Sequence, residues 1–224
     1  EIDFVLQKIA EPESSRKTLS VENNISANER FERNPSLQID QQNRINITPS
    51  EHLNDEQNDA LLVILSWLSD RLHHLGDPIH FSAPEQLLMF IHGGPGVGKS
   101  HFARELISRD PGIIVCAAPT GIAASELYRG RTLHDFLGLP TTCARPKILP
   151  PLKADKAAQL SVRLDGVRII LIDEVSMIDD LLLSWVDQRL QQLLLNSSPF
   201  ANLGVIMMGD FLQLCPVLGP SLFK

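Results

Sequence analysis

Short apolar runs separated by polar stretches dominate this chain after its first fifty residues. Four of these runs, at 87–91, 113–118, 167–172 and 203–208, are apolar at nearly every position. Strands that are buried on both faces have this pattern, which is typical of a parallel sheet rather than of an antiparallel sheet with one wet face. We therefore expect four parallel strands at the centre of the protein.

Helical patterns fill the intervals between the runs. They predict helices over about 60–75, 101–108, 122–127 and 179–195. The first follows the polar residues of 53–57 and stops at Gly76, as capped helices often do. Its stretch 61–65 is apolar nearly all round, so we expect this helix to be buried between the sheet and another element. Alternating strands and helices predict an α/β fold, a parallel sheet covered by helices on both faces.

The first fifty residues have a different composition. They are rich in Glu, Asn, Gln, Ser and Arg, and their scattered apolar residues keep neither a helical nor a strand period. Such a segment cannot bury much apolar surface. We expect a flexible polar tail or linker over 1–50, followed by a single lobe over 51–224.

Composition narrows the class of protein. The chain has 224 residues, 43% of them apolar, and a net charge of −7, which argues against a general nucleic-acid binder. No apolar run could span a bilayer and the first residues lack a signal peptide's basic start, so we expect an intracellular protein without a membrane partner. Cys116, Cys143 and Cys215 are too widely spaced to suggest a zinc site or a disulfide framework, which favours reduced thiols.

A phosphate-binding loop follows the first strand. Residues 93–100 fit G-x-x-x-x-G-K-[ST], with the glycines at the turn from strand to helix. In such a loop the backbone N–H groups and the helix amino terminus surround the phosphates, Lys99 reaches the β- and γ-phosphates, and the Ser100 hydroxyl ligates Mg²⁺. The loop residues expected to bind the nucleotide are Gly93, Gly94, Gly96, Val97, Gly98, Lys99, Ser100 and His101.

Two acids follow the third apolar run directly. Asp173 stands where a second carboxylate would approach Mg²⁺ through its water shell, and Glu174 could polarise the water that attacks the γ-phosphate. This pairing favours a hydrolase over a small-molecule kinase, and a plain surface turn is the weaker interpretation. Gln213, just past the fourth run, could sense the γ-phosphate, although taken alone this segment is better explained as a structural turn.

Basic residues gather between the second and third runs. Residues 129–168 contain eight Lys or Arg and three Asp, a local charge of 8 − 3 = +5 in an acidic protein. This excess could be a solvated face. It could equally be the phosphate-contacting side of a nucleic-acid groove, with Thr120, Thr132 and His134 as hydrogen-bonding partners.

Six blocks in one order also resemble a known family. They are 53–57, 93–100, 118–124, 132–138, 172–177 and 209–214. They are similar to the Q motif, motifs I and Ia, the T-[IL]-H-x-F-x-G block, and motifs II and III of the Pif-type (petite integration frequency) DNA helicases of superfamily one. That group includes the helicase part of Helitron-type transposons. The resemblance implies a RecA-like P-loop lobe.

The resemblance also implies an activity and residue roles. The family couples Mg-ATP hydrolysis to 5′-to-3′ translocation on single-stranded DNA and unwinds duplex or structured DNA, typically as a monomer that acts in DNA repair, recombination and telomere maintenance, in the nucleus where the host is eukaryotic. Gln57 would read the adenine, Lys99 and Ser100 would hold phosphate and metal, Asp173 and Glu174 would serve metal and water, and Gln213 would sense the γ-phosphate. The residues on or near the single-strand path would be Pro119, Thr120, Gly121, Thr132, His134 and Phe136.

Two features depart from the family pattern. Cys215 stands where the family usually has the first Pro of Pro-Pro-Val, and the sequence given ends at Lys224, soon after the sixth block. We expect this chain to contain only the first of two RecA-like lobes and to be nearly inactive alone. A small-molecule kinase would explain 93–100 but neither 118–124 nor 209–214. A relic lobe that binds nucleotide without turnover stays open.

Overall fold

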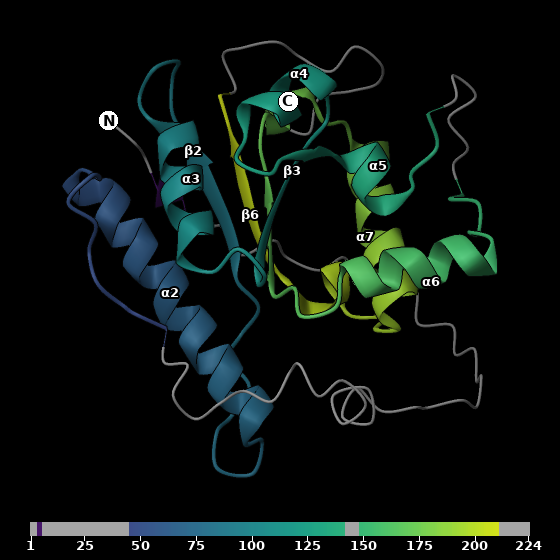
Figure 1. Ribbon diagram of the computed structural model, residues 1–224, viewed down its shortest axis with the longest axis horizontal. Coiled ribbons are helices and arrows are strands. Elements are labelled where there is room, and N and C mark those ends of the chain that lie inside the picture. The colour runs from purple at the N-terminus through teal and green to yellow at the C-terminus, as the bar shows by residue number, and fades with distance from the viewer. Residues whose placement is uncertain (1–3, 6–44, 142–147, 211–224) are drawn as a thin grey trace. The chain divides into compact units, whose positions relative to one another are not determined.

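The computed structural model describes the backbone of Phe4–Val5 and the residues 45–141 and 148–210 (Figure 1). Within these ranges the strands form a six-stranded sheet in the order β1-β2-β6-β5-β3-β4. The two-residue β1 is antiparallel to β2, and all other neighbours are parallel. The strands are β1 (Phe4–Val5), β2 (Leu88–His92), β3 (Ile114–Ala118), β4 (Arg131–Thr132), β5 (Ile169–Ile172) and β6 (Gly204–Gly209). The four strands predicted from the apolar runs are β2, β3, β5 and β6.

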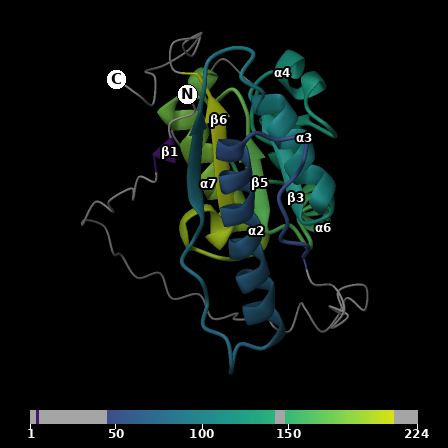
Figure 2. The same ribbon diagram turned by 90° about the vertical axis from the view of Figure 1, so that its left-hand side faces the viewer.

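Helices connect the parallel strands and cover both faces of the sheet. They are α2 (Asp55–Gly76), α3 (Lys99–Arg109), α4 (Gly121–Glu126), α5 (Leu133–Leu137), α6 (Ala154–Arg163) and α7 (Asp180–Leu194), with 3-10 turns η2 (Val175–Met177) and η3 (Pro199–Asn202). Figures 1 and 2 show α2 and α3 on one side of the sheet and α6 and α7 on the other. Of the helices described, none is long and apolar enough to cross a membrane.

Two hydrophobic clusters lie on the two faces. Successive residues of β5 alternate between them: Ile169 and Leu171 pack with α2 and α3, whereas Ile170 and Ile172 pack with α5, α6 and α7. A strand can only be apolar at every position if both faces are dry, which the two clusters provide. The prediction of a parallel sheet covered on both faces is confirmed.

Helix α2 is amphipathic, contrary to the expectation of burial all round. Leu61, Ile64, Leu65 and Leu68 are fully buried, but Val63 is 49% exposed. A helix that covers the outside of a sheet keeps a solvent side, so a continuous apolar run leaves some of its residues in water. The helix begins at Asp55, five residues before the expected start, because Asn54 and Gln57 form a reciprocal capping box.

The ordered lobe begins before residue 51. Ile45 packs against the cluster on the α2 side. Ser50 is buried, and its N–H donates to the Asn58 side-chain oxygen at 2.7 Å. The polar segment predicted as a tail therefore contributes its last residues to the lobe, and it also contains the short strand β1, which pairs with β2.

Candidate active site

The phosphate-binding loop lies between the end of β2 and the start of α3. Gly96 and Gly98 have φ values of +77° and +93°, a left-handed conformation that side chains rarely adopt and glycine tolerates. Gly98 is the N-cap of α3, and the first turn of α3 contains no acidic residue. No carboxylate in that turn therefore neutralises the partial positive charge of the helix terminus, and this favours the binding of an anion there.

The Lys99 ammonium lies across this loop. Its Nζ donates to the carbonyl oxygens of Gly93 and Gly94 at 2.6 and 2.9 Å. The loop is also fixed to the sheet, because the Gly93 N–H donates to the Gly209 carbonyl at the end of β6 at 3.3 Å. Lys99 therefore places its positive charge where the sequence predicts a phosphate. Its present acceptors are neutral carbonyl oxygens, weak partners that phosphate oxygens could replace.

Two predicted loop residues lie away from the glycine turn. Ser100 is exposed on the first turn of α3, where its hydroxyl is free to meet a ligand. The His101 ring instead contacts the carbonyl oxygen of His52, with Nε2 at 3.0 Å. This contact ties α3 to the segment before α2 and gives His101 a structural partner that the sequence did not predict.

The acidic pair follows β5, as predicted. Asp173 is only 6% exposed, and its Oδ1 accepts a hydrogen bond from the Glu174 N–H at 2.9 Å. Burial raises the pKa of Asp173, and the charge of Glu174 adds to this, while the Glu174 N–H and the Lys99 charge oppose it. Asp173 and Lys99 thus lie within electrostatic reach of one another, although their segments are more than seventy residues apart (173 − 99 = 74).

The turn after the acids packs against the end of β6. Glu174 itself has a φ of +52°, an uncommon conformation for a residue with a side chain. A Cβ on Gly209 would lie 2.9 Å from Val175 Cγ1 and 3.2 Å from the Val175 nitrogen, so the absent side chain is what allows the contact. The turn that follows Asp173 and Glu174 is therefore adjacent to Gly209, the first residue of the block 209–214. Gln213 and Cys215 lie outside the described residues.

Gln57 reaches the phosphate loop from α2. Its Nε2 donates to the Val97 carbonyl at 3.3 Å, while its Oε1 accepts from the Asn54 N–H at 3.2 Å.

A second neighbour of the site, missed from the sequence, is Cys116 on β3. Its thiol is free and buried, and burial together with the Asp173 charge raises its pKa. Cys143 lies outside the described residues.

The residues predicted along a DNA path lie at the carboxyl ends of β3 and β4. These strands pair in parallel with Ala118 opposite Thr132, so Pro119, Thr120 and Gly121 start beside Thr132. The Thr120 hydroxyl accepts from the Ala123 N–H at 3.2 Å and caps α4, and the Thr132 hydroxyl accepts from the Asp135 N–H at 3.1 Å and caps α5. Both hydroxyls have local structural roles.

Phe136 is not a surface ring. It is 3% exposed and belongs to the cluster under α5, with Leu133 and Leu137. These three residues have the i, i+3, i+4 spacing of one helix face. They lie in a helix, 133–137, that the sequence patterns did not predict. His134 is half-buried on the same short helix. The Phe136 ring therefore packs in the core beneath α5 and is not exposed for stacking on a DNA base.

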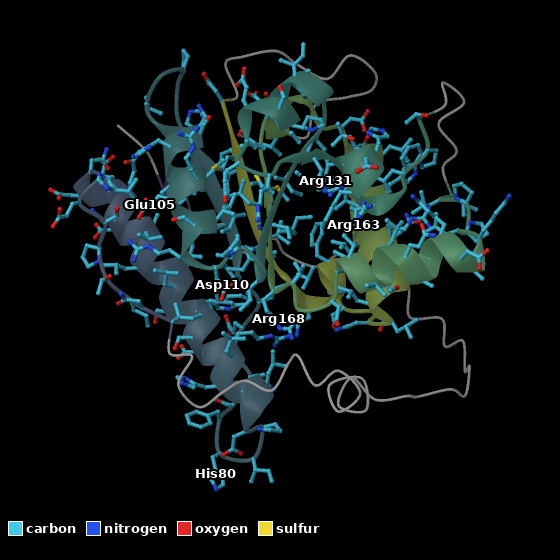
Figure 3. All side chains as sticks on the ribbon, viewed as in Figure 1. His80, Glu105, Asp110, Arg131, Arg163 and Arg168 are labelled. Atoms are coloured by element: carbon cyan, nitrogen blue, oxygen red, sulfur yellow. The ribbon has the colours of Figure 1, made fainter. Side chains whose placement is uncertain are left out.

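The basic stretch 129–168 does not form one face. Arg131 and Arg163 both approach the Asp135 carboxylate, at 3.2 and 3.6 Å, and lie near each other in Figure 3. Arg168 precedes β5, at the opposite end of the sheet, where it donates to the Val167 carbonyl at 2.8 Å and burial lowers its pKa. Arg145 and Lys147 lie outside the described residues. A single groove lined by the whole stretch is ruled out by the position of Arg168.

Known proteins are similar to this chain in sequence. The family model described as PIF1-like helicase matches residues 77–221. An ATP-dependent DNA helicase PIF1 of Candida albicans is 34% identical over 135 residues, which are 58% of this chain and 15% of the relative. A counterpart from Bdellovibrio bacteriovorus is 36% identical over 130 residues, 58% of this chain and 29% of the relative.

Solved structures agree with the sequence relatives. The crystal structure of Bacteroides Pif1 bound to ssDNA superposes with a TM-score of 0.55 at 28% identity, covering 74% of this chain and 34% of that one. Pif1 from Candida albicans gives the same TM-score and coverage. The fold is thus the RecA-like lobe of these proteins, and this chain spans about a third of their length. With a family model that matches well over half of its residues, the chain belongs to the PIF1-like helicase family.

Proposed function

We propose that this chain is the nucleotide-binding lobe of an ATP-dependent DNA helicase that moves 5′-to-3′ on single-stranded DNA. The observation that carries the proposal is the convergence of three segments at one edge of the sheet. The loop after β2 supplies Lys99, the end of β5 supplies Asp173 and Glu174, and the first turn of α2 supplies Gln57. Each is distant in sequence from the others.

The residues of this edge fit a magnesium nucleotide. Burial raises the pKa of Asp173, while the nearby Lys99 charge lowers it, and a divalent cation would likewise stabilise the ionised carboxylate. The Ser100 hydroxyl and Asp173 are the groups we assign to Mg²⁺, which when bound neutralises charge on the β- and γ-phosphates. Lys99 exchanges its two loop carbonyls for phosphate oxygens, and Glu174 accepts a proton from the attacking water.

DNA binding is proposed for the carboxyl ends of β3 and β4. Relatives described as bound to ssDNA, one of them also with ADP-AlF3, support both ligands. At this edge Pro119, Gly121 and His134 remain candidates for contact with the strand. The polarity of movement and the monomeric state rest on the family resemblance alone.

A binding experiment tests the proposal. A fluorescent ATP analogue with Mg²⁺ is titrated against the protein and against Lys99→Ala, and a fluorescein-labelled oligothymidylate is titrated in parallel. Saturable binding of both ligands, with nucleotide binding lost in Lys99→Ala, is the expected result. Nucleotide binding without any DNA binding would instead favour a relic lobe, and phosphoryl transfer to metabolites rather than water would favour a kinase.

A further inference from the structure

A tight turn projects from the sheet edge between α4 and β4. The Gly130 N–H donates to the Leu127 carbonyl at 3.0 Å, which places Tyr128 and Arg129 at the two central positions of a β-turn. Both ends of the turn are fixed. Leu127 is buried, and a Cβ on Gly130 would clash with the Ala124 carbonyl oxygen and with Leu127 Cβ.

The two central side chains face solvent together. Tyr128 is 45% exposed, and Arg129 is exposed with its guanidinium carbon 5.7 Å from the centre of the tyrosine ring. This is a cation–π arrangement. The ring is thus paired with a positive charge at the surface instead of packing in either hydrophobic cluster.

Arg129 adopts a conformation that favours glycine. Its φ is +56°, at the turn position where a left-handed residue is needed and Gly or Asn is usual. An arginine is strained there, and its side chain is exposed, so the strain is not offset by burial. Strain of this kind clusters at sites that bind ligands.

The turn also lies beside the proposed DNA path. It joins α4, which begins at Gly121, to β4, which ends at Thr132, and β4 pairs with β3 at the edge of the sheet. Gly121 and Thr132, in the segments on either side of the turn, are among the residues that the family resemblance places on or near the DNA path. Among the basic residues of 129–168 that the structure describes, Arg131 and Arg163 face the Asp135 carboxylate, whereas Arg129 faces a neutral ring.

We propose that Tyr128 and Arg129 bind one nucleotide of single-stranded DNA. The tyrosine ring stacks on the base, and the guanidinium contacts a neighbouring phosphate. Aromatic rings stack on every base and arginine reads only the phosphate charge, so the pair gives affinity without sequence preference. This assignment rests on the proposed function and adds to it a site in the turn between the blocks 118–124 and 132–138.

A single spectroscopic reporter tests the contact. Tyr128 is the only tyrosine of the 224-residue chain, so biosynthetic 3-fluorotyrosine gives one ¹⁹F resonance. Unlabelled oligothymidylate is titrated while anisotropy of the labelled strand measures affinity separately. We expect the resonance to shift and to saturate with the same affinity.

Matched variants separate binding from stability. Tyr128→Ala should weaken oligothymidylate binding roughly 5- to 150-fold, the range for loss of one stacked base, and Tyr128→Phe should bind as the parent does. Arg129→Gly relieves the strained backbone, so it should melt at the same or a higher temperature. It should nevertheless flatten the slope of log affinity against log salt by about 0.7, one phosphate contact.

The outcomes distinguish this inference from the proposed function. DNA binding with an unshifted resonance and an unaffected Tyr128→Ala overturns the inference and leaves the helicase proposal standing. Arg129→Gly that melts lower yet binds normally would make the turn purely structural and would also overturn it. A protein that binds the ATP analogue but no oligothymidylate at all overturns both.

Discussion

The side-chain amide of Gln57 donates a hydrogen bond to the carbonyl oxygen of Val97 at 3.3 Å, which ties the first turn of α2 to the phosphate loop. The same side chain caps α2 through its oxygen. Both ends of the amide are therefore engaged. Because the amide nitrogen has a second hydrogen and the oxygen a second lone pair, Gln57 has the capacity to hydrogen-bond an adenine, as the family resemblance implies, while it keeps both contacts.

Replacing Gln57 by glutamate should separate its two contacts. Glu keeps the oxygen that caps α2 but loses the donor to Val97, whereas Ala loses both. We expect Gln57→Glu to melt near the parent and Gln57→Ala to lose about 1 kcal/mol of stability. Both should discriminate ATP from GTP less well, because the site loses its donor to the base. Thermal melting and titrations with the two fluorescent nucleotides check this, and equal discrimination in the parent would contradict it.

Lys99→Ala should abolish binding of the Mg-ATP analogue and leave the fold intact. The variant removes the ammonium that lies on the Gly93 and Gly94 carbonyls, and a half-buried side chain at a loop is expected to cost no more than about 1 kcal/mol of stability. His101→Ala is the matched control: the sequence predicts His101 in the nucleotide site, but its ring contacts His52 and not the loop, so the variant changes no side chain at the phosphates. Its affinity for the nucleotide should be within about twofold of the parent's, a difference well below tenfold. Unchanged affinity in Lys99→Ala would refute the predicted role.

Asp173→Asn should make the protein more stable at neutral pH and unable to respond to Mg²⁺. Because burial raises the pKa of Asp173, the folded state favours the protonated acid, and stability is lost as pH rises through the folded-state pKa. Asparagine keeps the acceptor for the Glu174 N–H without that ionisation. The stability difference should shrink as pH falls toward the ordinary aspartate pKa of about 3.9.

The measurement for Asp173 is thermal melting over a pH series, with and without Mg²⁺ and the ATP analogue. Mg²⁺ and the ATP analogue should raise the melting temperature of the parent but not that of Asp173→Asn, because a ligand stabilises only a protein that binds it. A variant that is less stable than the parent at neutral pH would show that the buried carboxylate is stabilised by its surroundings, contrary to this account.

Gly209→Ala should weaken both the fold and the site. The new Cβ would meet Val175 Cγ1 at 2.9 Å and the Val175 backbone at 3.2 Å, so the turn after the acids must move. We expect a loss of about 1–3 kcal/mol and weaker nucleotide binding. Gly76→Ala, at the last residue of α2 and outside the phosphate loop, is the control for adding a methyl group, since nothing lies within 4 Å of its Cβ position. Adding Val175→Ala to Gly209→Ala should restore part of the stability, and no rescue would indicate that the backbone contact dominates.

Sequence patterns predicted the elements that depend on long apolar runs. β2, β3, β5 and β6 were found because their apolar runs are continuous, although only β5 is buried at every position and β2 is buried at alternate ones. The loop of 93–100 was found from its glycines, two of which have a positive φ. The short helices α5 and α6 were missed. Helix α5 has five residues, too few for a period to be recognised, and α6 buries only Leu160 completely.

The contacts at the site that the sequence did not predict are ones that no local pattern encodes. Phe136 was placed on a DNA path through its motif, but its burial depends on helix α5 packing against the sheet. Arg168 was counted in a basic groove although its position before β5 puts it at the other end. The bond between Gln57 and Val97 joins residues forty positions apart, and no spacing rule predicts it.

The sheet order has a consequence for synthesis of the chain on the ribosome. β2 carries the phosphate loop, yet its parallel partner β6 is made 117 residues later, since Leu88 pairs with Val205 (205 − 88). Until β6 emerges, the Gly93 N–H has no Gly209 carbonyl to bond. A nascent chain that already contains the whole of residues 93–100 should therefore not yet hold ATP. Nucleotide binding should appear abruptly, only after β6 has been made and non-local pairing closes the sheet.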